Sequence, residues 1–111
     1  MNNPVDLTNL RTMTDGDTDM EKALFEEFFS TFESGISVLK ETTQEAAADD
    51  WRKQAHALKG VAMNLGAEVL GELCKQGQEE CNAGAEVKAE LLKKIQTEYE
   101  RAKAFLETVH S

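Results

Sequence analysis

Apolar residues recur at spacings of three and four along most of the chain, which is the pattern of helices that bury one face. No stretch sustains the apolar–polar alternation that is typical of a half-buried β-strand. The pattern predicts a short helix over about residues 6–13, followed by longer helices over about 18–45, 49–65, 67–82 and 86–109. The predicted fold is all-α: an antiparallel up-and-down four-helix bundle with a short N-terminal cap helix, in one domain spanning residues 1–111.

The apolar stripes also predict which residues form the core. In the helix over about 18–45 the predicted inner residues are Met20, Leu24, Phe25, Phe28, Phe29, Phe32, Gly35, Ile36 and Leu39. In the helix over about 49–65 they are Trp51, Ala55, Leu58, Ala62 and Leu65. Gly35 lies in mid-helix, where glycine costs about 1 kcal/mol against alanine. It marks either a close helix crossing or a tolerated weakness, and the sequence leaves both interpretations open.

Polar residues and glycines mark the expected helix ends. Thr18 and Glu21 have the spacing of a capping box, in which a hydroxyl at the N-cap is followed by a carboxylate three residues later. Asp49 is the candidate N-cap of the helix that follows. Gly66 suits the left-handed position directly after that helix ends.

The charge balance excludes several classes of partner. A net charge of −9 argues against nucleic acid, whose phosphates must be neutralised by cations, and against an anionic membrane surface. The first residues carry no apolar core behind a basic start, so no signal peptide is expected. No apolar run approaches the roughly 20 residues that span a bilayer. We therefore expect a cytoplasmic protein.

The cysteines and histidines do not form a metal-binding pattern. Cys74 and Cys81 lie seven residues apart on one predicted helix, which places their Cα atoms about 10.5 Å apart, too far for a disulfide. Two reduced thiols are expected, and this spacing is not that of a zinc pair. His110 lies close to the end of the sequence and is expected to be disordered. We expect neither a metal nor a cofactor.

One stretch stands apart from this acidic chain. Residues 51–67 contain none of its 21 acidic residues, although they contain three cations and the other histidine, His56. On a helix His56 lies at the border of the buried stripe. Its neighbours on the same face are Arg52, Lys59, Gly60 and Met63.

This arrangement is suited to a phosphorylatable histidine. Phosphoryl transfer to an imidazole needs a neutral ring nitrogen, cations for the phosphoryl oxygens and a steric opening. Arg52 and Lys59 disfavour the protonated ring and can balance the charge of a phosphohistidine. Gly60 is unfavourable in a helix, and the simplest explanation is that a side chain there would cover the imidazole. The competing interpretation is that His56 is an ordinary surface histidine.

The motif H-x-L-K-G at residues 56–60, followed by N-L-G at residues 64–66, closely resembles the histidine-containing phosphotransfer (HPt) domain family. A second helix with apolar and cysteine positions follows in that family, and Leu70 and Cys74 fit it. The order of the helices, with a short leading helix before a long one, fits as well. The resemblance covers almost the whole chain.

The resemblance implies a phosphocarrier in a multistep two-component phosphorelay, not an enzyme in its own right. A receiver domain would give its aspartyl phosphoryl group to His56, which would pass it to another receiver. Lys59 matches the residue that steadies the phosphoryl group, and Gly60 the one that leaves room for it. The receiver would supply the magnesium ion. The partners would be response-regulator receiver domains or a hybrid sensor histidine kinase.

Two more residues are candidates for the same site. If the helices on either side of Gly66 are antiparallel, Gln78 is roughly level with His56, and its amide can reach the imidazole or its phosphate. A solvated glutamine is an equally good interpretation. Met63 is bulkier than the small residues that often follow the family motif, so it is a candidate docking contact.

The sequence leaves one alternative function open. A helical adaptor without phosphotransfer could use the same helix flank, and it would keep its partners when His56 is replaced by glutamine. The initial methionine and the polar start favour a free-standing shuttle over an excised kinase domain. A monomer is expected, because the flank with His56 must stay exposed.

Overall fold

The computed structural model describes residues 3–110, and in this range it contains helices and no strands. The elements in chain order are α1 (Thr8–Thr14), α2 (Thr18–Glu41), the short 3₁₀ helix η1 (Glu45–Ala47), α3 (Ala48–Leu65), α4 (Glu68–Glu79) and α5 (Ala85–Val109). The prediction of an all-α fold is confirmed.

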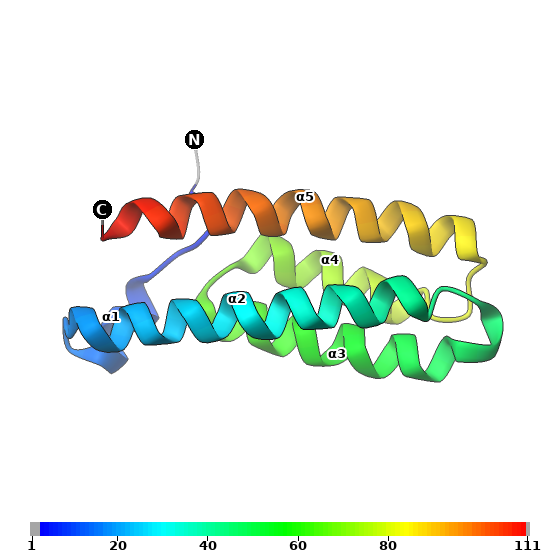
Figure 1. Ribbon diagram of the computed structural model, residues 1–111, viewed down its shortest axis with the longest axis horizontal. Helices are drawn as coiled ribbons and strands as arrows, with labels where there is room; N and C mark the ends of the chain where they lie inside the picture. The colour runs from blue at the N-terminus through cyan, green and yellow to red at the C-terminus, as the bar shows by residue number, and fades with distance from the viewer. Residues whose placement is uncertain (1–2, 111) are drawn as a thin grey trace.

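The four longer helices lie side by side along the 45 Å axis of the molecule (Figure 1). In this view α2 and α4 run from left to right, and α3 and α5 run back (Figure 1). α2 packs on α3 and α5, and α4 packs on the same two helices, so the four enclose one core. α1 packs on α2 and α3 at one end.

The core is built from the apolar stripes of these helices. All five residues predicted for the inner face of α3 are buried, because a stripe repeating every three or four residues stays on one side of a helix. Phe32 of α2 stacks on Tyr99 of α5 at a centroid distance of 5.0 Å. The Trp51 indole donates a hydrogen bond of 2.7 Å to the Gly77 carbonyl, which ties α3 to α4.

The start of α2 differs from the prediction. The N-cap is Asp17, not Thr18, and its side chain accepts a hydrogen bond from the Met20 N–H at 3.1 Å. Met20 is 48% exposed, whereas Glu21 is buried. Glu21 turns inward because Thr14 donates a hydrogen bond to its carboxylate. The predicted capping box and the core position of Met20 were therefore both wrong.

Several helix ends also differ. α2 ends at Glu41 because Thr42 leaves the helical conformation and its hydroxyl donates back to the Val38 carbonyl at 2.9 Å. The expected end, near residue 45, is instead the start of η1. Asp49 does not cap α3, which begins one residue earlier; its carboxylate pairs with side chains of its own helix. α4 ends at Glu79, three residues before the expected end, and a turn connects it to α5.

Two glycines are explained by close approach of the backbone. A Cβ on Gly35 would lie 2.5 Å from Leu58 Cδ2, so Gly35 marks a close crossing of α2 and α3, which decides between the two interpretations above. Gly66 has φ 100°, the left-handed conformation predicted for it. A Cβ there would also collide with the Asp6 carbonyl, and the Asp6 N–H donates to the Gly66 carbonyl at 2.9 Å.

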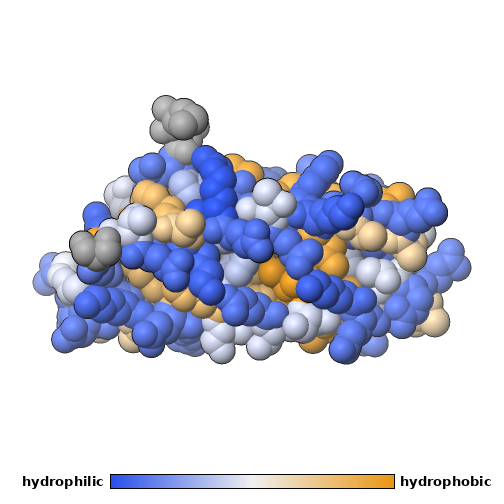
Figure 2. Space-filling model, turned by 45° about the horizontal axis from the view of Figure 1, so that its top comes forward, coloured by the Kyte–Doolittle hydropathy of each residue, from blue (hydrophilic) through white to orange (hydrophobic). Residues whose placement is uncertain are grey.

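Hydrophilic side chains cover most of the face in Figure 2, with hydrophobic patches between them. Within residues 3–110, no helix has both the length and the apolar character needed to cross a bilayer. Both cysteines are free thiols, as their spacing predicts.

Candidate functional site

His56 lies in the middle of α3, where this helix runs beside α4. Its neighbours Ala55 and Leu58 are buried and fix the rotation of the helix, so the imidazole is left on the exposed side. We call the line along which α3 and α4 meet the α3–α4 seam, and define it by His56, Lys59 and Met63 of α3 and Gly71 and Gln78 of α4.

Gln78 contacts the imidazole across this seam. His56 Nδ1 lies 3.2 Å from Gln78 Oε1. An amide oxygen only accepts hydrogen bonds, so Nδ1 must carry the proton and donate it. In the neutral imidazole the other nitrogen, Nε2, then keeps its lone pair. The prediction that Gln78 lies level with His56 is confirmed, and the contact fits the tautomer in which Nε2 keeps its lone pair.

The two predicted phosphoryl-binding cations have different surroundings. Arg52 donates a hydrogen bond of 2.7 Å to Asp49 and is not paired with His56. Lys53 lies 3.1 Å from the same carboxylate. Hydrogen bonds from these two cations lower the pKa of Asp49, and the Asp49 carboxylate raises the pKa of Arg52. Lys59 is half-buried and has no ion-pair partner in residues 3–110.

Gly60 has no packing role within the described chain. A Cβ built on it would meet nothing within 4 Å, in contrast to the close contacts of Gly35 and Gly66. The fold therefore gives no reason for a glycine here, and the opening beside His56 stays a prediction. Met63, two turns after His56, is 36% exposed.

The register of α3 and α4 adds a residue that sequence reasoning missed. Lys75 lies one turn before Gln78, and Lys59 one turn after His56, so the two lysines are level across the seam. Lys75 is exposed. Its spacing of three from Gln78 is the signal that could have placed it on this face.

Cys74 and the candidate metal ligands are further groups within residues 3–110 whose residue types can be reactive. Burial raises the pKa of the Cys74 thiol to about 12, so this cysteine is an inert core residue. In residues 3–110 no group of three or more His, Cys, Asp or Glu side chains is placed to hold a metal ion.

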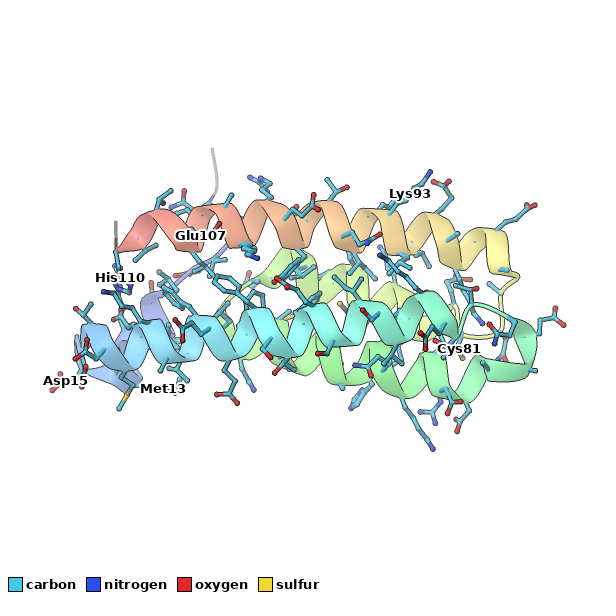
Figure 3. The ribbon with its side chains drawn as sticks, viewed as in Figure 1. Met13, Asp15, Cys81, Lys93, Glu107 and His110 are labelled. Atoms are coloured by element: carbon cyan, nitrogen blue, oxygen red, sulfur yellow. The ribbon has the colours of Figure 1, made fainter. Side chains whose placement is uncertain are left out.

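His110 is ordered, contrary to expectation. Its Nε2 lies 2.9 Å from Glu21 Oε1, and its ring stacks on Phe25 at a centroid distance of 5.4 Å. Figure 3 shows His110 at the end of α5, beside the first turns of α2. Packing and a carboxylate partner fix this second histidine, which the sequence position alone did not indicate.

Residues 6–105 match the family model described as the Hpt domain, which covers nearly the whole chain. The chain belongs to the HPt domain family. No curated protein and no solved structure matches it.

Membership has direct consequences for function. HPt domains carry out histidine phosphotransfer in two-component signalling, and they are phosphocarriers rather than enzymes. Their family interacts with response-regulator receiver domains and kinases. The helical bundle seen here is the architecture of that family.

Proposed function

We propose that His56 is the phosphoacceptor of a multistep phosphorelay, and that it accepts a phosphoryl group from a receiver aspartyl phosphate and passes it to another receiver. The observation that carries this proposal is the contact between His56 Nδ1 and Gln78 Oε1 on an exposed helix flank. With the proton on Nδ1, the lone pair is on Nε2, and the exposed position of His56 lets a partner approach the ring.

The transfer step follows from this tautomer. Nε2 attacks the phosphorus atom, and a nitrogen–phosphorus bond forms as the bond between phosphorus and the aspartyl oxygen breaks. The aspartate leaves as a carboxylate, and the Nδ1 proton stays on its hydrogen bond to Gln78. The receiver, not this chain, supplies the magnesium ion and the acidic pocket. The domain contributes a positioned nucleophile, which is the main requirement when the partner brings the rest.

The cations of the seam would then balance the phosphohistidine. Lys59 pairs with no carboxylate within residues 3–110 and is the first candidate; Lys75 is level with it across the seam. Arg52 would have to exchange Asp49 for the phosphoryl group, so we assign it a smaller contribution. Gly60 would keep the approach to Nε2 open.

The proposal includes the setting of the exchange. The domain would act as a monomer, because a partner must reach the seam. Two free thiols support a reducing compartment, so we place the exchange in the cytoplasm. No cofactor of its own is needed for this chemistry.

Transfer from a phosphorylated receiver domain tests the proposal. Wild type and His56→Gln would be incubated with the same receivers and read by intact mass, before and after acid treatment. The expected result is one acid-labile phosphoryl group on wild type and none on the variant. Transfer retained by His56→Gln would refute the assignment. A wild type that binds receivers without accepting phosphate would instead be the helical adaptor.

A further inference from the structure

A methionine of α3 lies directly over a glycine of α4. A Cβ built on Gly71 would lie 2.7 Å from Met63 Cε, 2.8 Å from Sδ and 2.9 Å from Cγ. Real Cβ atoms essentially never come within 3.0 Å of such neighbours. The Met63 side chain therefore fills the space that a side chain at position 71 would need.

This contact repeats the geometry of the phosphoacceptor pair. Met63 is seven residues after His56 on α3, and Gly71 is seven residues before Gln78 on α4. Equal steps in opposite directions keep residues level on antiparallel helices. The Met63–Gly71 contact thus lies on the same seam as the imidazole, about 10.5 Å along the helix axis.

Helix geometry does not explain the glycine at position 71. Glycine is a poor helix former, and Gly71 lies inside α4. It is not among the glycines with positive φ, which in residues 3–110 are Gly16 and Gly66, so the backbone conformation does not demand it. All three of the nearest atoms that a Cβ would meet belong to Met63. The missing side chain is what makes room for the methionine.

The geometry points to Gly71 as a positioning residue that holds Met63 down in the α3–α4 seam and thereby sets the shape of the surface a receiver meets beside His56. This inference rests on the proposed function. Cγ, Sδ and Cε of Met63 all lie along Gly71, so moving the terminal methyl group alone would not admit a Cβ. In Gly71→Ala the whole side chain would turn outward and stand in the path of a docking receiver.

The test measures phosphoryl transfer against receiver concentration, which separates docking from chemistry. Gly71→Ala is expected to raise the half-saturating receiver concentration by about threefold or more and to leave the limiting rate within about twofold. Met63→Ala alone loses a contact and gives a smaller rise. The double variant Met63→Ala/Gly71→Ala is expected to match Met63→Ala, because the obstructing side chain is gone.

Gly77→Ala is the matched control. It places the same methyl group in the same helix, but its nearest neighbours would lie 3.8 Å away, an ordinary contact. It should leave the half-saturating concentration unchanged. Thermal unfolding of each variant checks folding. If Gly71→Ala does not fold, Met63→Leu is used instead. The branched end of leucine does not fit along Gly71 as the unbranched thioether of methionine does. Met63→Leu should therefore also raise the half-saturating receiver concentration.

The outcomes separate the two proposals. A wild-type half-saturating concentration in Gly71→Ala, or in Met63→Leu where that variant is used, would overturn the positioning role. The positioning role would also be overturned if the double variant kept the effect of Gly71→Ala. In that case the displaced Met63 side chain would not be the cause of the effect. A wild type that accepts no phosphoryl group from any receiver would refute the proposed function and this inference with it.

Discussion

The two histidines of this chain lie on opposite seams of the bundle, and their surroundings differ in one respect above all. On the α3–α4 seam the ring of His56 contacts a neutral amide and is exposed. Where α5 meets α2, the ring of His110 contacts the buried carboxylate of Glu21 and stacks on Phe25. We call this second region the α2–α5 seam, defined by Glu21, Phe25 and Glu33 of α2 and Tyr99, Lys103 and His110 of α5.

The α2–α5 seam is closed by contacts to the carboxylates of Glu21 and Glu33. Glu33 accepts hydrogen bonds from Tyr99 at 2.5 Å and Lys103 at 2.9 Å. Glu21 accepts from Thr14 and lies 3.8 Å from Arg11, in addition to its contact with His110. The ring of His110 is thus held between a carboxylate and an aromatic ring and is half-buried, whereas the ring of His56 is exposed. The comparison teaches that, of the two histidines, the one on α3 is open to a partner.

Exchanging each histidine for alanine should give opposite losses, and this is the largest effect we expect. His56→Ala should abolish phosphoryl transfer and change the free energy of unfolding by less than about 0.5 kcal/mol, because the ring is exposed. His110→Ala should keep transfer and cost about 1–2 kcal/mol, since it removes the partner of a buried carboxylate and a ring stack. Transfer rates and urea unfolding measure both. Loss of transfer in His110→Ala would break the comparison.

Gly60→Ala should improve the fold and impair the function. The added Cβ would meet no side chain and no other described element within 4 Å, so alanine should stabilise the helix by about 0.5–1 kcal/mol. The same methyl group would lie one turn after His56 on the face that a receiver approaches, and it should slow transfer about tenfold or more by displacing the receiver. The midpoint of urea unfolding and the transfer rate are the two measurements. Faster or unchanged transfer would show that the open space at position 60 is not needed.

Gln78→Ala should slow transfer by about three- to tenfold, because one hydrogen bond no longer holds the Nδ1–H tautomer. Unfolding should be unaffected, since Gln78 is half-buried at the rim of α4. Gln76→Ala, on the exposed side of the same helix, is the matched control. Equal transfer rates in both variants would remove Gln78 from the site.

Much of this picture could be predicted from the sequence, because it depends on local periodicity. The buried stripe of α3, the left-handed Gly66 and the level position of Gln78 follow from helical spacing and one turn. Arg52 pairs with Asp49 at a spacing of three. That pairing is also local in sequence. It was missed because Asp49 lies just before residues 51–67, the stretch without acidic residues in which His56 was identified.

The errors came from contacts that spacing does not encode. Thr18 and Asp17 are both good caps by residue type, and Glu21, which the capping box needed, instead contacts His110, 89 residues away. Lys88 was not expected in the core, yet it is fully buried with its Nζ 5.5 Å from the Trp51 ring centroid. Lysine is a polar residue in any hydrophobic pattern, so the pattern places Lys88 on the surface. Only the packed structure shows that its ammonium group lies near the face of the Trp51 ring.

The smallest effect concerns the pKa of Glu33, which is lowered from 4.5 chiefly by the hydrogen bond from Tyr99 and then by Lys103. A carboxyl with a lowered pKa in the folded state stabilises the protein above its unfolded pKa, and this contribution is lost as pH falls through the folded value. Glu33→Gln should therefore be less stable than wild type at about pH 7, and the difference should vanish at about pH 2–3. Urea unfolding at both pH values measures it, with the exposed Glu26→Gln as control. A difference that grows as pH falls would contradict the assignment.

The most direct test of the central claim locates the proton and the phosphorus on the histidine rings. Protein labelled with ¹⁵N-histidine would be examined by long-range ¹H–¹⁵N NMR at about pH 8, where an imidazole is mainly neutral, before and after phosphorylation by a receiver. The account predicts that His56 carries its proton on Nδ1 and then acquires a phosphorus coupling on Nε2, with His110 unchanged. A phosphorus coupling on Nδ1 of His56, or on His110, would contradict it.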